Sequence, residues 1–274
     1  MPLSHTLTSG PHRSVCLVSC RGAERPQTGR LALYLLGLRA TCPPTKPHRA
    51  LVTWLKYYLE EDWTGSRRHG HPLTNYYQYG LGVLALCAHH KRVREEVIRR
   101  LLEAQHRGRL GHSAVDTEAV LALAFACLER RRLVGAGLAA ELRDTVHRVS
   151  RSMAQAQGPE GIIGNIYSTP WALQVFLATG MCHTEPAYSR AMAALLENLD
   201  AFGTATTMAQ VLPVLHGHSY LDIASMRCQE ELGMSQGQPG WGWCQCHRGG
   251  GRVSINTTVT SHRYTDTPRR GAPD

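Results

Sequence analysis

The chain has 274 residues, enough for one large core or two modest domains. Aromatic residues make up only 7% of it, and Ala and Leu are prominent among the apolar residues, a composition typical of packed helices. The formal net charge is +9, but no nucleic-acid motif or aromatic interleaving accompanies the basic runs. We therefore expect a solvated basic face and no nucleic-acid partner, with a weak preference for anions or membrane surfaces as the alternative.

Residues 1–27 are rich in Ser, Thr, Pro, Arg and Gly and predict an irregular leader. This leader has no continuous apolar stretch and no clear cleavage site, so no signal peptide is visible. The apolar run that follows, Leu31–Leu38, is far too short to cross a bilayer. The sequence therefore predicts no membrane insertion.

From Thr28 to Ile223 one pattern occurs five times: a short polar opening is followed by an Ala/Leu/Gly-rich helix. The five openings are Thr28–Arg30, Thr74–Tyr79, Val115–Thr117, Tyr167–Pro170 and Thr206–Gln210. Amphipathic helices are expected between them, near Lys46–Asp62, Arg92–Gln105, Gly137–Gln157 and Glu185–Asn198. Turn residues predict the breaks between helices, among them Gly65, Gly70, Gly108 and Gly158.

A unit of two helices cannot bury its apolar face alone and must stack on its neighbours. If every second helix faces inward, the five polar openings lie at the same end of an inner ring, where a ligand should bind. The sequence therefore predicts an all-α fold of paired helices over residues 28–228. Residues 229–274 are rich in Gly, Ser and Thr and predict a disordered tail.

The openings and the residues beside them hold more polar side chains than helix capping requires. Ser, Thr and Asp at a helix start are most often N-caps, and this interpretation stays open for each of them. Capping does not need the amide and phenol groups of Tyr76, Tyr77, Gln78, Asn165, Tyr167 and Gln210. These neutral hydrogen-bonding groups favour a large, amide-rich, neutral ligand over a phosphate or a sugar acid.

Catalytic motifs are absent from the sequence. It contains no Ser/His/Asp order, nucleophile elbow or HExxH motif. A helical ring could house a glycosidase, which needs two carboxylates flanking one bond. Asp116 and Glu118 are two positions apart on a predicted helix, so they point to different faces and cannot both line one site. We predict that the chain is not an enzyme.

Three of the nine cysteines, Cys42, Cys87 and Cys127, stand at the ends of three predicted inner helices. Such ends can approach one another in a ring, which allows disulfides to form. The pairing stays open at this point, because spacing alone does not determine it.

Four segments occur in the order YYQYGLGVLALC, HSAVDTEAVLALAFACL, GIIGNIYSTPWALQ and AQVLPVLHGHSYLD. Because of these four segments and their order, the chain from about Gly29 to Cys228 resembles the cobalamin (vitamin B12) transport proteins, the family of transcobalamin, haptocorrin and gastric intrinsic factor. The resemblance implies an α/α-toroid of paired helices followed by a small β domain, with cobalamin held between them. It also implies a secreted, transcobalamin-like, non-catalytic carrier. The amide side chains on the rim of corrin fit the amide-rich openings.

The resemblance implies contacts with the corrin amides at Thr74, Tyr77, Gln78, Asp116, Asn165, Ser168 and Gln210. It further implies that His112, just before the VDT motif, ligates cobalt, for which a neutral imidazole is suitable. Simple surface exposure of this histidine is the alternative. The expected partners are cobalamin and a cell-surface receptor, and the expected location is extracellular.

Disulfide bonds also follow from the resemblance. It implies that Cys87 pairs with Cys127 and that Cys42 pairs with Cys228. Cys182 would pair with a cysteine near the mature N-terminus; here Cys16 or Cys20 would have to take that role, or Cys182 stays free.

The chain departs from the family in three respects. An unrelated leader stands where family members have a signal peptide and further helices, so the toroid is expected to be incomplete. The β domain is missing after Cys228, and Arg30 stands where the family has a glutamine that contacts the ligand. Because a single domain loses the clamp between domains, we expect weaker cobalamin binding than in a complete carrier, or none. The alternatives are a ligand-free helical interaction protein and, less expected, a toroid-fold enzyme.

Overall fold

The computed structural model describes residues 28–42, 48–69, 71–110 and 114–226, and the predicted leader and tail lie outside them. Within these residues every regular element is a helix, apart from a single bridge between Gln157 and Ile163. The α-helices are α1 (Thr28–Thr41), α2 (His48–His69), α3 (Tyr76–Ala88), α4 (Glu95–His106), α5 (Ala114–Arg130), α6 (Ala136–Gln155), α7 (Thr169–Thr179), α8 (Pro186–Glu197), α9 (Ala205–Leu215) and α10 (Tyr220–Ile223). Short 3₁₀ helices at Met181–His183 and Leu199–Ala201 flank α8. The all-α prediction is confirmed for the described part of the chain.

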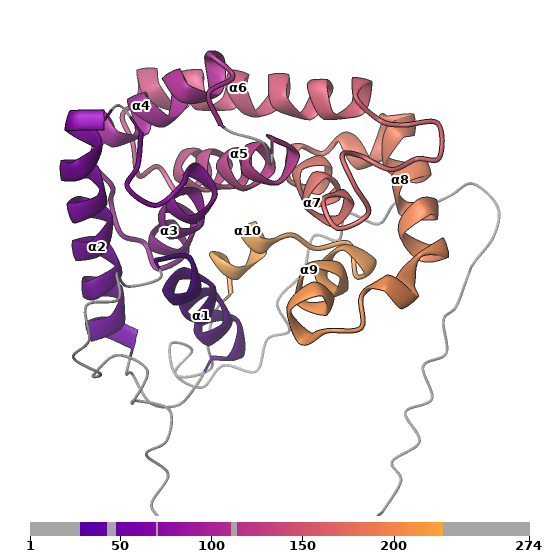
Figure 1. Cartoon of the computed structure of the whole chain (residues 1–274), viewed down its shortest axis with the longest axis horizontal. Coiled ribbons are helices and arrows are strands. Elements are labelled where there is room, and N and C mark those ends of the chain that lie inside the picture. Colours follow the sequence, from indigo (N-terminus) through magenta and orange to yellow (C-terminus); the bar gives the residue numbers. More distant parts are fainter. Residues whose placement is uncertain (1–27, 43–47, 70, 111–113, 227–274) are drawn as a thin grey trace, which may run out of the picture.

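The helices form two layers (Figure 1). α1, α3, α5, α7 and α9 lie in this order as the inner layer, each in contact with the next. In the outer layer α2 packs on α1 and α3, α6 packs on α5 and α7, and α8 packs on α7. α4 belongs to the same layer, where its Arg99 approaches Glu141 of α6 at 3.2 Å. This is the paired-helix arrangement of an α/α-toroid, as the alternation of apolar and amphipathic segments predicts.

Hydrophobic patterning explains why the two kinds of helix take different layers. In α7 every residue from Thr169 to Ala178 is buried, and a helix that is apolar on all sides must be surrounded by protein. α4 buries only Val97, Ile98, Leu101, Leu102 and Ala104, which form one stripe at helical spacing. α4 therefore covers the inner layer and exposes its charged face. No helix among the described residues is long and apolar enough to cross a membrane.

Two glycines let the neighbours of α3 approach it closely. A Cβ atom at Gly82 would lie 2.9 Å from Leu59 Cδ2 of α2, and one at Gly80 would lie 3.0 Å from Leu121 Cδ2 of α5. Larger side chains at these positions would push the helices apart. The small residues of α3 therefore set the spacing between the two layers and between inner neighbours.

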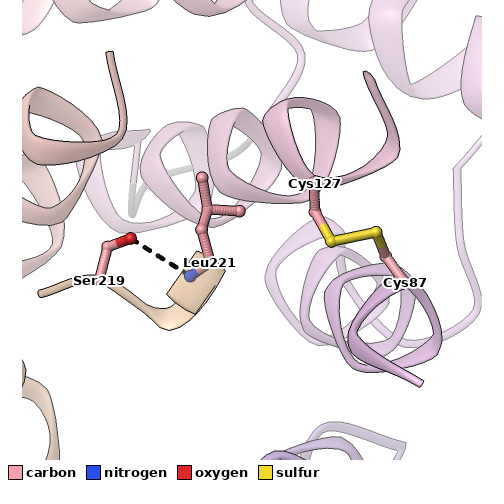
Figure 2. The surroundings of a disulfide bond; sticks show 4 residues. All are labelled: Cys87, Cys127, Ser219 and Leu221. Carbon is pink, nitrogen blue, oxygen red and sulfur yellow. Dashed lines mark hydrogen bonds between the residues drawn. A yellow bond between two sulfur atoms is a disulfide. The ribbon is translucent and has the colours of Figure 1, made fainter. Parts of the chain in front are cut away.

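A disulfide joins the C-terminal ends of two inner helices (Figure 2). Cys87 of α3 is bonded to Cys127 of α5, and both side chains are buried. This confirms the predicted pairing. Cys42 is also disulfide-bonded, and Cys228, its predicted partner, lies outside the described residues.

α10 lies inside the arc of inner helices (Figure 1). It contacts α1 and α5, and the buried Leu221 points towards α5 in Figure 2. Ser219 and Asp222 form a capping box: the Ser219 hydroxyl accepts from the backbone N–H of Leu221, and the Asp222 carboxylate accepts from that of Ser219. The sequence pattern extends the helical region to Ile223 but does not predict that its last segment enters the ring.

The predicted break at Gly65 is wrong. α2 continues through Gly65 to His69, because one glycine costs a helix only about 1 kcal/mol relative to alanine. Asp62 therefore lies within the helix, where it is buried. Its carboxylate accepts hydrogen bonds from the backbone N–H of Leu73 and from the backbone N–H and hydroxyl of Thr74. These bonds hold the segment before α3 against α2.

Candidate functional site

The five polar openings meet at one end of the inner layer, which we call the mouth. Gly29 of α1 donates its backbone N–H to Gln78 Oε1 of α3 at 3.4 Å. A Cβ atom at Gly164, just before α7, would lie 2.9 Å from Val115 of α5. The rings of Tyr77 and Trp171 join α3 to α7, and α7 in turn contacts α9. The structure thus brings together segments that lie far apart in the sequence.

An aromatic wall connects three helices at the mouth. Trp171 of α7 is buried, and the rings of Tyr77 from α3 and Tyr220 from α10 meet it edge to face at 6.1 Å and 5.3 Å. Burial, and to a smaller extent the charge of Asp116, raises the pKa of Tyr77 far above its ordinary value. Burial also raises the pKa of Tyr220 to about 12. Both phenols therefore stay protonated at physiological pH and can donate hydrogen bonds.

Asp116 supplies a buried acceptor beside this wall. It lies in the first turn of α5 and is half-buried. Its Oδ1 atom is buried and has no hydrogen-bond donor among the described residues. A buried acceptor without a donor costs about 1–3 kcal/mol, which an N–H group from a ligand would recover. Asp116 can therefore accept a hydrogen bond from a further donor at the mouth.

Glu118 lies on a different side of α5 from the mouth. A hydrogen bond with Gln105 of α4 lowers the pKa of Glu118, but its burial raises that pKa by more. The charge of Asp116 instead raises the pKa of Tyr77, which lies on α3 of the inner layer. The two carboxylates thus face different helices, as their spacing predicts, and do not form a catalytic pair.

Of the three predicted contact residues at or just before the start of α3, Thr74 and Gln78 already make internal hydrogen bonds. The Thr74 hydroxyl donates to Asp62 Oδ2 at 2.5 Å, so it can only accept a hydrogen bond from a ligand. Gln78 Oε1 accepts from Gly29, and its NH₂ group is the part of the amide that can donate. Asn75 caps α3 by accepting from the backbone N–H of Gln78 at 2.8 Å.

Asn165 and Ser168 lie at the start of α7. Asn165 is exposed, and its Oδ1 atom accepts from the backbone N–H groups of Tyr167 at 2.8 Å and Ser168 at 2.9 Å. Ser168 is buried, and Tyr167 is exposed and packs edge to face on Phe202 at 5.5 Å. Asn165 therefore stabilises the turn before α7, and its NH₂ group can still donate to a ligand.

The remaining predicted residues are Gln210 and His112. Gln210 is half-buried in α9, and His112 lies outside the described residues. The structure thus brings Tyr77, Asp116 and Gln78 to the mouth with the start of α7. It adds Tyr220, which sequence reasoning missed because α10 reaches the mouth only through tertiary packing.

Gln174 is a second residue that sequence reasoning missed. Its side chain is fully buried in α7. Its Oε1 atom accepts from the backbone N–H of Tyr220 at 2.9 Å, and its Nε2 atom donates to the backbone oxygen of Gln210 at 3.3 Å. One amide therefore fixes α9 and α10 relative to α7. The signal for it was a lone amide inside the apolar run WALQVFLAT.

We expect the substitution Gln174→Leu to lower the free energy of unfolding by about 2 kcal/mol, because it removes the acceptor of the buried N–H of Tyr220 and the side-chain hydrogen bond to the carbonyl of Gln210. Urea denaturation followed by circular dichroism measures this change. Gln174→Glu, which keeps the shape, should recover stability at acidic pH, where the protonated carboxyl can donate to Gln210. Equal stability of Gln174→Leu and the unmodified chain would contradict this role.

Comparison with known proteins identifies relatives along most of the chain. A family described as "Eukaryotic cobalamin-binding protein" matches residues 3–240. Human Transcobalamin-2 is 42% identical over 217 residues, which cover 76% of this chain and 50% of that protein. Human Transcobalamin-1 is 29% identical over 213 residues, covering 72% and 49%. Canine "Cobalamin binding intrinsic factor" is 28% identical over 209 residues, covering 73% and 48%.

A solved structure shares the fold. The crystal structure of haptocorrin in complex with Cbi matches with a TM-score of 0.65 and 24% sequence identity. The match covers 74% of this chain and 55% of that chain. The present chain spans about half the length of the curated relatives it matches.

Proposed function

Because this chain belongs to the eukaryotic cobalamin-binding protein family, we propose that it is a transcobalamin-like carrier that binds cobalamin at the mouth and performs no catalysis. The chemistry of the mouth supports this proposal. Corrin carries amide side chains around its rim, and each primary amide offers both N–H donors and a carbonyl acceptor. The protein offers matching neutral groups beside one carboxylate.

The observation that carries the proposal is the buried Oδ1 atom of Asp116, which lacks a donor among the described residues. A corrin amide N–H is a suitable partner for it. The neutral phenol of Tyr77 can donate to an amide carbonyl, and its half-buried ring, which packs on the buried Trp171, can contact the ring edge. Thr74, Gln78, Asn165, Ser168 and Gln210 are the further contacts we propose.

We also propose that the protein works outside the cell. The Cys87–Cys127 disulfide supports this, as does the second disulfide at Cys42, because such bonds persist in oxidising compartments.

Equilibrium binding of cobalamin to the purified, oxidised full chain tests the proposal. The expected result is saturable one-to-one binding, followed by the visible absorption of the corrin or by equilibrium dialysis. A folded, helical chain that binds no cobalamin at saturating concentration would contradict the proposal. It would favour a helical interaction protein without a ligand, in which the polar openings serve only as helix caps.

We expect His112 to replace the cobalt-bound water of aquocobalamin, since a neutral imidazole is a suitable ligand. Binding should then shift the visible spectrum of aquocobalamin, and His112→Ala should abolish that shift while part of the affinity remains. His147→Ala, which changes an exposed histidine on the outer helix α6, is the control and should keep the shift. A shift that survives in His112→Ala would remove this residue from the site.

A further inference from the structure

Exposed apolar side chains gather at the two ends of the helical arc. The inner layer begins at α1 and ends at α9, and α2 and α8 are the outer helices nearest to these ends (Figure 1). The four helices carry all but two of the large apolar side chains that are exposed in the described part of the chain: Tyr34, Trp54, Tyr57, Leu196, Leu212 and Leu215. The other two, Leu73 and Tyr167, lie at the mouth. The helices between the ends, α3 to α7, expose none, so the exposure marks the surfaces where the arc stops.

One side of α1 faces away from the arc. The helix buries Ala32 and Leu35, whereas Arg30, Tyr34 and Gly37 are exposed. These three exposed residues recur at helical spacing and therefore form one stripe. A Cβ atom added at Gly37 would have nothing within 4 Å. Among the described residues, this stripe is an open face on an inner helix.

α2 presents a second part of this open face. Its Glu60 pairs at 3.8 Å with Arg94, which stands just before α4, and its Glu61 accepts a hydrogen bond from the hydroxyl of Tyr57. Both carboxylates are thus engaged within the chain. Trp54 lies on a different side of the helix from Glu60 and is 41% exposed. We call the exposed side of α1 and α2, with Tyr34 and Trp54, the first end face.

α9 forms an open face at the other end of the arc. It packs on α7, and its Leu212 and Leu215 are 46% and 36% exposed. The half-buried Met208 precedes them at helical spacing, so the three side chains form an apolar stripe. We call this stripe, with the residues that connect α8 to α9, the last end face.

The two end faces differ in charge, although the chain as a whole carries +9. α1 contains Arg30 and Arg39 and no acidic residue. The segment Ala191–Leu215 contains no Lys or Arg, and its charged residues are Glu197 and Asp200, both exposed. Arg30 lies at the start of α1, and Asp200 lies shortly before the start of α9. Since the inner helices begin at the mouth, these opposite charges lie at the same end of the inner layer.

We propose that the chain forms a two-fold dimer in which the first end face of each copy packs on the last end face of the other. The occupant of each face is a second copy because the two faces complement each other in charge and are both apolar. A two-fold axis forms both contacts at once, since every copy offers one face of each kind. An axis parallel to the inner helices brings Arg30 of one copy to Glu197 and Asp200 of the other. This inference does not depend on cobalamin binding.

Sedimentation equilibrium of the full, oxidised chain over a range of concentrations tests the inference. The mass should rise reversibly from that of one chain, 30.3 kDa, towards twice that value. A mass that stays at one chain throughout would overturn the inference, and it is the result expected if residues 1–27 of the same chain covered the first end face. A dimer that persists in denaturing electrophoresis without reductant would also overturn it, because the association would then be covalent.

Exchanging the charges of the two end faces gives a sharper test. Arg30→Asp makes both faces acidic, and Glu197→Arg/Asp200→Arg makes both basic. Each variant alone should dimerise at least about tenfold more weakly, because attraction becomes repulsion at two contacts. An equimolar mixture of the two variants should form a heterodimer with the affinity of the unmodified chain. Failure of the mixture to associate, while the unmodified chain dimerises, would overturn the pairing of the faces.

Leu212→Gln tests the apolar part of the last end face and should weaken dimerisation about tenfold, since the change affects both contacts. Leu73→Gln is its matched control, because Leu73 is similarly exposed, at 38%, but lies at the mouth. Arg148→Asp, at an exposed position on α6, is the control for the charge variants. Both controls should dimerise as the unmodified chain does. Equal weakening by Leu212→Gln and Leu73→Gln would indicate general apolar adhesion and overturn the inference.

Discussion

Asp116→Ala should weaken cobalamin binding about thirtyfold, which corresponds to about 2 kcal/mol. The carboxylate lies beside Tyr77, and its buried Oδ1 atom has no hydrogen-bond donor in the described part of the chain. In the complex this oxygen would accept from a corrin amide, and a hydrogen bond to a charged group is stronger than one between neutral groups. Equilibrium dialysis or absorption titration of the full chain measures the change.

Glu118→Ala is the matched control for Asp116→Ala. Both carboxylates lie near the start of α5, but Glu118 interacts with Gln105 of α4 and lies away from the mouth. The control should therefore bind cobalamin as the unmodified chain does. Asp116→Ala should also keep the stability of the chain, because the buried Oδ1 atom that is lost has no donor among the described residues. Equal affinity of the two variants would contradict the assignment of Asp116.

Cys87→Ala/Cys127→Ala should lower the free energy of unfolding by about 4 kcal/mol. The bond closes a loop between residues separated by 40 positions. Without it the unfolded chain gains conformational entropy, and the value follows from the loop length in the chain-entropy treatment. Both cysteines are buried where α3 meets α5, so their loss also removes packing in the inner layer.

Urea denaturation of the oxidised double variant and the oxidised unmodified chain measures this effect. Adding a reductant to the unmodified chain is a less specific experiment, because Cys42 is disulfide-bonded as well. Reduction of the double variant then reports on the remaining disulfide bonds, among them the one at Cys42. An unchanged denaturation midpoint in the oxidised double variant would contradict the expected stabilisation.

The inner and outer layers could be predicted from the sequence, because the hydrophobic periodicity of a helix is a property of its own residues. An apolar run such as Thr169–Ala178 must be surrounded by protein, whereas the stripe from Val97 to Ala104 can cover only one face. The prediction that the helix ends at Gly65 is wrong, because contacts along α2 outweigh the modest free-energy cost of one glycine in a helix. The Cys87–Cys127 pairing came from the family resemblance, since spacing alone leaves the pairing open.

The sequence by itself determined the all-α class, the alternation of inner and outer helices and the gathering of the polar openings at one end. These features follow from helical spacing along a contiguous segment. Only the tertiary structure decided that Asp62 accepts a hydrogen bond from the Thr74 hydroxyl, that Tyr220 enters the aromatic wall and that Gln174 joins three helices. Each depends on contacts between residues distant in the sequence, and local periodicity carries no information about which hydrogen-bond partner a folded side chain meets.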